Sequence, residues 1–312
     1  MEHILDAQNP RANLSKDVLD KEYSPSQCSN RVTATFTPGA IIADYVDIAR
    51  NETMKARDQF RHDLDVKVSE TSTVDIYWPE NSDNDQQQFE PKYVFVYVHG
   101  GNWEAISTAE AGHMANVICP RGIVVVTVGY SLAPKAHLSL MVQEVQSAFA
   151  YVAHRFSTSR IVGCGFSAGA HLLAQSMASV NWKDAYGIEP SRFHSMISLC
   201  GLLDLYLVRC SYVNDFLRLS EEEAKQLSPI HNVQSMKQFV SDKHSLNFLI
   251  AVGEFDSSEY RKLSDSYRHV VEAELGVKVK YEELQGHDHF QIDASLTNAG
   301  SALMKLIDSI LQ

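Results

Sequence analysis

The sequence lacks any long run of apolar residues, although 45% of its 312 residues are hydrophobic. A membrane-spanning helix needs about 20 consecutive apolar residues, so we expect no such helix. The first residues also lack the basic start and the apolar centre that a secretory signal requires. Together these absences predict a cytoplasmic protein that does not bind membranes.

Cysteine and basic charge are also scarce. The five cysteines are an odd number and are widely spaced, so they predict neither a disulfide framework nor a metal site. Asp and Glu outnumber Lys and Arg by 39 to 27, which gives a formal net charge of −12, and the basic residues form no stripe. Such a chain repels a phosphate backbone, so nucleic acid is not an expected partner. The sequence is compatible with a homodimer.

The spacing of apolar residues predicts a single α/β domain over residues 1–312. Alternating apolar and polar residues are typical of a hairpin at a sheet edge, and they occur at 66–68 and 74–77. Solid apolar runs indicate strands covered on both faces, and they follow at 93–98 and 123–128. Later strands are expected at 161–164, 246–252 and 277–284. Helical spacing predicts helices at 138–152, 258–275 and 294–311. This repetition predicts a mainly parallel central sheet with helices on both faces.

Two segments depart from that rhythm. Residues 1–18 are polar and mixed in character, so we expect them to be mobile. Residues 204–244 are polar and partly helical, and they interrupt the alternation of strand and helix. We expect this second segment to be a small cap inserted over the functional site.

The run Gly165-Phe166-Ser167-Ala168-Gly169 directly follows a buried strand and opens a helix. A serine on a sharp turn between strand and helix needs small neighbours two residues away, because larger side chains would collide with the adjacent elements. This is the position of the nucleophile in the α/β-hydrolase fold. We therefore predict that fold, with Ser167 as the catalytic nucleophile.

A second motif, His99-Gly100-Gly101-Asn102-Trp103, stands at the end of the strand at 93–98. Its glycines leave backbone N–H groups accessible, and such groups can hold the negative oxygen of a tetrahedral intermediate. The predicted oxyanion hole comprises Gly100, Gly101, Asn102 and Ala168. We favour Gly101 and Asn102 as the donors from the loop.

A serine nucleophile needs a histidine base and an acid that orients it, in the chain order serine, acid, histidine. Asp256 and Glu254 both follow the strand at 246–252. Asp256 is favoured because it lies further into the loop, although it could instead cap the next helix. His287 and His289 compete as the base, and His289 is favoured because the apolar residues after it can anchor the loop.

Three aromatic residues near these motifs could line a substrate pocket or could simply belong to the core. They are Trp103, Tyr130 and Phe166. His171, in the helix after the nucleophile, is expected to be structural.

Taken together, the motifs resemble the kynurenine formamidase (arylformamidase) family. The similar segments, spread over residues 19–293, are 19–26, 99–103, 167–172, 200–205, 256–257 and 288–290. The resemblance implies that Ser167, Asp256 and His289 correspond to the nucleophile, acid and base of the family, in preference to Glu254 and His287.

The chain also departs from the family pattern at three positions that border the pocket. They are Asn102, Phe166 and Phe255. None of the three removes a catalytic group, so the departures bear on substrate preference more than on reaction type.

The resemblance implies that N-formyl-L-kynurenine, an intermediate of tryptophan catabolism, is cleaved to kynurenine and formate through an acyl-enzyme. This mechanism needs no metal or organic cofactor. One alternative is a general carboxylesterase acting on short acyl or aryl esters, which uses the same constellation of groups. Another is a non-catalytic member of the fold that binds a ligand or a protein, against which the intact serine, acid and base argue.

Overall fold

The structure is a computed structural model, and it describes residues 14–82, 89–241 and 244–311. A central sheet of eight strands runs through it, in the order β1-β2-β4-β3-β5-β6-β9-β10. The strands are β1 (His62–Lys67), β2 (Thr73–Tyr77), β3 (Tyr93–Val98), β4 (Val124–Gly129), β5 (Arg160–Phe166), β6 (Phe193–Leu199), β9 (Asn247–Gly253) and β10 (Val279–Leu284). Two short strands, β7 (Val240–Ser241) and β8 (His244–Ser245), pair separately.

The sheet is parallel from β4 to β10, whereas β2 pairs antiparallel with both β1 and β4. Every residue of β3 is buried, but β1 at the edge is largely accessible. This difference follows from the sequence, because solid apolar runs need cover on both faces while an alternating strand needs it on one. The prediction of a mainly parallel sheet with an edge hairpin is confirmed.

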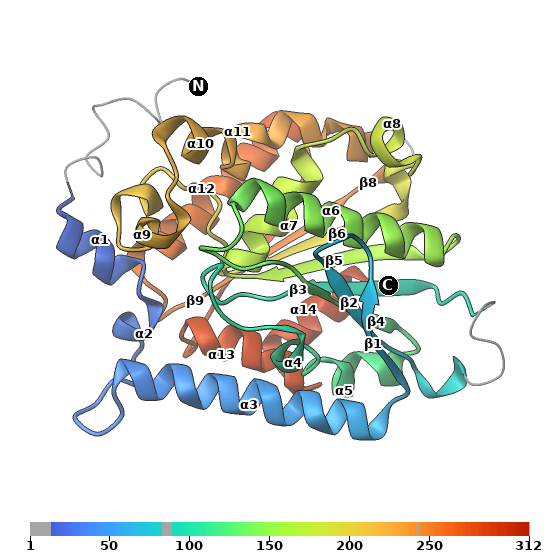
Figure 1. Ribbon diagram of the computed structural model, residues 1–312, viewed down its shortest axis with the longest axis horizontal. Coiled ribbons are helices and arrows are strands. Elements are labelled where there is room, and N and C mark those ends of the chain that lie inside the picture. The colour runs from blue at the N-terminus through green and yellow to red at the C-terminus, as the bar shows by residue number, and fades with distance from the viewer. Residues whose placement is uncertain (1–13, 83–88, 242–243, 312) are drawn as a thin grey trace.

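Helices cover both faces of this sheet (Figure 1), with α6, α7 and α12 on one side and α3, α13 and α14 on the other. The helices are α1 (Lys16–Glu22), α2 (Pro25–Cys28), α3 (Pro38–Gln59), α4 (Thr108–Ala111), α5 (Ala115–Ile118), α6 (Leu138–Arg155), α7 (Ala168–Ala178), α8 (Trp182–Tyr186), α9 (Asn214–Leu217), α10 (Glu221–Gln226), α11 (Pro229–Asn232), α12 (Ser258–Leu275), α13 (His289–Ala294) and α14 (Ala302–Ile310). Within the described ranges, none of them has the length and apolar content needed to cross a membrane.

Two features of the fold differ from the predictions. The single helix expected at 294–311 is wrong: α13 and α14 are separate, because the segment between them contains Asn298 and Gly300, and Ser301 starts a new helix by accepting the N–H of Met304. Strand β6 was not predicted, because histidine and serine residues interrupt its apolar pattern, yet it is buried throughout.

The two segments that depart from the α/β rhythm are folded as far as the structure describes them. Residues 1–13 of the expected mobile start lie outside the described residues, and α1 already begins at Lys16. The segment 204–244 contains α9, α10 and α11, and Figure 1 shows α9 and α10 on the same side of the molecule as α1.

Candidate active site

Ser167 occupies the sharp turn between β5 and α7. Its φ of 54° lies in the left-handed region that side chains rarely adopt, and its N–H donates to the carbonyl of Leu199 at 2.8 Å. A Cβ on Gly165 would lie 2.5 Å from the carbonyl oxygen of Gly169, and a Cβ on Gly169 would collide with the carbonyl of Val98. The two glycines are therefore required for this turn, which holds the serine at the carboxyl end of the sheet.

His289 and Asp256 form a buried pair beside this turn. His289 begins α13, Asp256 lies in the turn after β9, and Nδ1 of His289 donates to Oδ2 of Asp256 at 2.8 Å. Because Nδ1 carries the donated proton, Nε2 of the neutral ring is left as an acceptor. A general base for a serine hydroxyl must have this tautomer.

The competing candidates have other partners. Glu254 accepts the N–H of Gly286 at 2.7 Å and thereby ties the loop after β9 to the loop after β10. His287 is half-buried and bonds to a carbonyl of its own loop at 2.7 Å. The capping role considered for Asp256 belongs to Ser257, whose hydroxyl accepts a backbone N–H of α12.

The loop after β3 folds tightly against the turn that carries the serine. Gly101, Asn102 and Trp103 have φ of 98°, 57° and 61°, and the Gly101 carbonyl accepts two N–H groups further along the loop, at 3.0 and 2.9 Å. No backbone carbonyl of the described residues accepts the N–H of Gly100, Gly101, Asn102 or Ala168. Of these four residues, Gly101 and Asn102 also line the cavity that contains Ser167.

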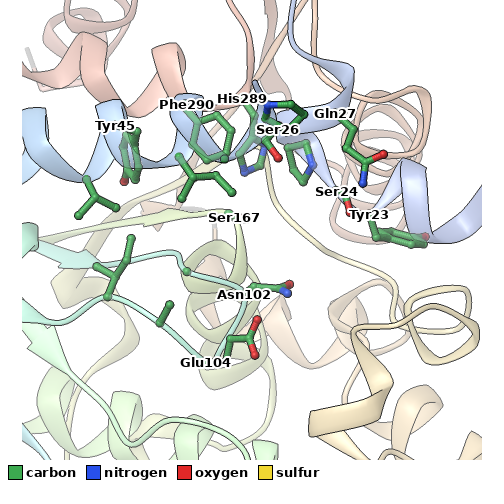
Figure 2. A pocket seen from close by; sticks show the side chains of 18 of the residues that line it. Tyr23, Ser24, Ser26, Gln27, Tyr45, Asn102, Glu104, Ser167, His289 and Phe290 are labelled. Atoms are coloured by element: carbon green, nitrogen blue, oxygen red, sulfur yellow. The ribbon is translucent and has the colours of Figure 1, made fainter. Parts of the chain in front are cut away.

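Ser167 and His289 both line a cavity of about 730 Å³ (Figure 2). Its other walls come from the segment 20–27, the start of α3 and the loop after β3. Of the three aromatic residues considered for a pocket, Phe166 lines this cavity, whereas Trp103 and Tyr130 are buried outside its lining.

Comparison with known proteins places this chain in a family. The family model BD-FAE matches residues 74–266. A kynurenine formamidase of Danio rerio is 34% identical over 297 residues, which cover 94% of this chain and 96% of that protein. A kynurenine formamidase of Salmo salar is 33% identical with the same coverage of 94% and 96%. The chain belongs to the kynurenine formamidase family.

A solved structure agrees with the fold of this kynurenine formamidase family member. A candidate thioesterase from Silicibacter sp. TM1040 matches it with a TM-score of 0.75 at 20% identity, covering 93% of this chain and 98% of that one. At that identity the likeness concerns the fold alone. The predicted α/β-hydrolase fold is confirmed.

The side chains of His99 and Trp103 pack against neighbouring rings and thereby hold the loop after β3 in place. The His99 ring stacks on Tyr130 with centroids 4.3 Å apart, and the Tyr130 hydroxyl donates to the carbonyls of His99 and Gly100 at 2.9 and 3.2 Å. The Trp103 ring packs edge-on against His171 at 5.2 Å. Burial lowers the pKa of His99 and of His171 to about 4 in each case, so both rings are neutral and structural.

Four tyrosines of the described residues line the cavity, and none was predicted from the sequence as a site residue: Tyr23, Tyr45, Tyr212 and Tyr260. Tyr260 of α12 packs edge-on against His289 at 4.8 Å; burial raises its pKa well above the usual value, and a hydrogen bond with Ser167 opposes that shift. Tyr45 of α3 packs on Phe290 with ring centroids 5.3 Å apart. Tyr45 lies far in the sequence from every motif, and Tyr260, four residues after Asp256, belongs to the predicted helix at 258–275, so only the folded chain shows that both line the cavity.

A buried cluster of charged and polar side chains surrounds Asp293 of α13. Asp293, one turn after His289, accepts the hydroxyls of Tyr45 at 2.8 Å and Tyr97 at 2.6 Å, and it lies 3.1 Å from Nε2 of His113. Burial alone would raise the pKa of Asp293, but the charge of His113 and these hydrogen bonds hold it below the usual range. Burial likewise opposes the charge of His113, yet Asp293 raises its pKa. The cluster fixes α13, and with it His289, against α3 and β3.

Cys200 adds a third polar atom near the pair. Its Sγ, an Asp256 carboxylate oxygen and a ring nitrogen of His289 lie within 4.8 Å of one another, a set that could in principle ligate a metal. The thiolate is the form that binds metals, however, and burial raises the pKa of Cys200 well above the usual value. The donor set therefore suits a neutral thiol beside Asp256 better than a metal ligand.

Proposed function

We propose that this protein is an arylformamidase that hydrolyses N-formyl-L-kynurenine to kynurenine and formate. The observation that carries the proposal is the hydrogen-bonded pair His289–Asp256 beside Ser167, on the wall of a cavity with aromatic side chains. The relatives named kynurenine formamidase, at 34% and 33% identity, support the same reaction.

In the first half of the proposed reaction, Nε2 of His289 takes the proton of Ser167 as its oxygen attacks the formyl carbon. The N–H groups of Gly101, Asn102 and Ala168 hold the oxygen that becomes negative. His289 then gives the proton to the nitrogen of the aromatic amine as the C–N bond breaks. The amine departs, and a formyl ester on Ser167 remains.

In the second half, His289 takes a proton from water, which attacks the formyl ester. Collapse of the second tetrahedral intermediate releases formate and returns the proton to Ser167. An aromatic amine with an ortho carbonyl group is a better leaving group than an alkyl amine, so an esterase-like site is suited to this amide.

We also propose that the chain is one domain in the cytoplasm, with the segment 204–244 as a cap over the site. Tyr212 supports the cap, because this residue of the segment lines the cavity. The segment 20–27 lines the same cavity, so two segments of the chain would cover the site.

The test compares kcat/KM of the purified protein for N-formyl-L-kynurenine and for phenyl acetate. We expect formamide hydrolysis with kcat/KM on the order of 10⁴ M⁻¹s⁻¹ or higher, within the usual range for enzymes. Ester turnover that exceeds formamide turnover by orders of magnitude would instead identify a general carboxylesterase. Turnover of neither compound would favour a non-catalytic binding protein.

A further inference from the structure

The cavity has two chemically different sides. Tyr45, Phe166 and Phe290 contribute aromatic side chains near His289. Figure 2 shows Glu104 and Asn102 across the cavity from Tyr45 and Phe290. A molecule bound with its aromatic ring on the first side can therefore extend a polar side chain toward the second.

Several groups meet on the polar side. Burial raises the pKa of the Tyr212 hydroxyl, and the charges of Glu104 and Asp20 raise it further. The hydroxyl donates to the carbonyl of Tyr23 at 3.3 Å, and the neighbouring Ser24 and Asn102 side chains lower its pKa. All five residues line the cavity, so two carboxylates and three neutral groups share its polar side: Asp20, Ser24, Asn102, Glu104 and Tyr212.

The two carboxylates differ in their existing partners. Asp20 pairs with Lys16 at 3.0 Å and accepts the N–H of Tyr212 at 2.6 Å. Glu104 forms no ion pair with any described residue. Glu104 is an exposed residue on the cavity wall, and partial desolvation still raises its pKa, while a hydrogen bond with Asn102 opposes this shift. Glu104 is thus the carboxylate that a bound cation would stabilise most.

We propose that Glu104 is a specificity-determining residue that receives an ammonium group on the side chain of the substrate. The inference rests on the proposed formamidase function, since it needs the formyl group at Ser167 and the aromatic ring near Phe166. It assigns a preferred class of substrate: aryl formamides whose ring bears a side chain that ends in a protonated amine.

The residues that line the cavity also determine how well it can bind a carboxylate on such a substrate side chain. No described residue that lines the cavity is Lys or Arg, so a substrate carboxylate has only neutral donors such as Asn102 and Gln27 to receive it. A carboxylate close to Glu104 would also be repelled. We therefore expect the amine analogue that lacks the carboxylate to be hydrolysed at least as efficiently as the amino acid.

The experiment measures kcat and KM for three formamides: N-formyl-L-kynurenine, its analogue without the amino group, and its analogue without the carboxylate. Wild type is compared with Glu104→Gln, which keeps the shape and the amide contact but removes the charge. Glu282→Gln is the matched control, because Glu282 is exposed on β10 and is not in the cavity lining.

For wild type we expect the analogue without the amino group to be the poorest substrate. In Glu104→Gln, the preference for the two amine-bearing substrates over that analogue should fall about fivefold, mainly through KM, as suits a partly solvated charge pair. Added salt should reduce the wild-type preference, and Glu282→Gln should match wild type.

An unchanged preference in Glu104→Gln, or an equal loss in Glu282→Gln, would overturn the role of Glu104 while leaving the formamidase function intact. Hydrolysis of none of the three formamides by wild type would overturn the proposed function and the inference together. A wild-type preference for the amino acid over the amine analogue would overturn the account of the carboxylate.

Discussion

Replacing Ser167 with alanine is expected to lower kcat/KM for N-formyl-L-kynurenine by a factor on the order of 10⁵ to 10⁶. The reason is that no covalent intermediate can form, and His289 and Asp256 then have no nucleophile to activate. The fold should persist, because the substitution removes one oxygen atom, and alanine, like serine, carries a Cβ at this positive φ. The measurement is steady-state kinetics together with thermal unfolding of the same preparation.

Ser147→Ala is the control for this prediction. Ser147 lies on α6, where its hydroxyl donates to a carbonyl of the same helix at 2.9 Å, so the variant also loses one hydroxyl and one hydrogen bond. It should retain wild-type kinetics. Activity in Ser167→Ala within tenfold of wild type would contradict the assignment of the nucleophile.

Replacing Asp293 with alanine is expected to destabilise the protein by about 3–5 kcal/mol, the usual cost of removing one partner of a buried ion pair. His113, Tyr45 and Tyr97 would lose their common acceptor while remaining buried. For a domain of this kind Tm should fall by on the order of 10 °C. Since α13 also carries His289, kcat of Asp293→Ala should fall at temperatures where this variant is still folded.

The matched control is Asp308→Ala, which removes a carboxylate from a partly exposed pair with Arg121. A pair of that kind contributes about 0.2–1 kcal/mol, so Tm should change by a few degrees at most. An equal decrease in Tm for the two variants would show that the Asp293 cluster stabilises the fold no more than a partly exposed ion pair does. Thermal unfolding followed by circular dichroism gives both values.

The sequence predicted those parts of the site that depend on local chain context. Ser167 stands between a buried strand and a helix, and the small residues that the turn needs are its near neighbours in the chain. The positions of Asp256 and His289 followed from the ends of two late strands. In the structure these loops meet, because β9 and β10 are neighbours with their carboxyl ends on one edge.

The rest of the site depends on contacts between distant segments, which no local pattern encodes. Tyr45 comes from α3 and Tyr260 from α12, yet both line the same cavity. Trp103 belongs to a motif, but its ring packs beneath the loop against His171. Sequence proximity to a catalytic group therefore indicated some of the aromatic side chains that line the cavity, Phe166 and Phe290, but not Tyr45.

The central claim, a formyl ester on Ser167, is tested most directly by competition between water and hydroxylamine. The protein is given either N-formyl-L-kynurenine or phenyl formate, and the ratio of formohydroxamate to formate is measured, with Ser167→Ala used to subtract the uncatalysed reaction. A common formyl-enzyme predicts the same ratio from both donors, because the leaving group departs before the acceptor attacks. A ratio that differs between the two donors, or no formohydroxamate above the Ser167→Ala background, would contradict the account.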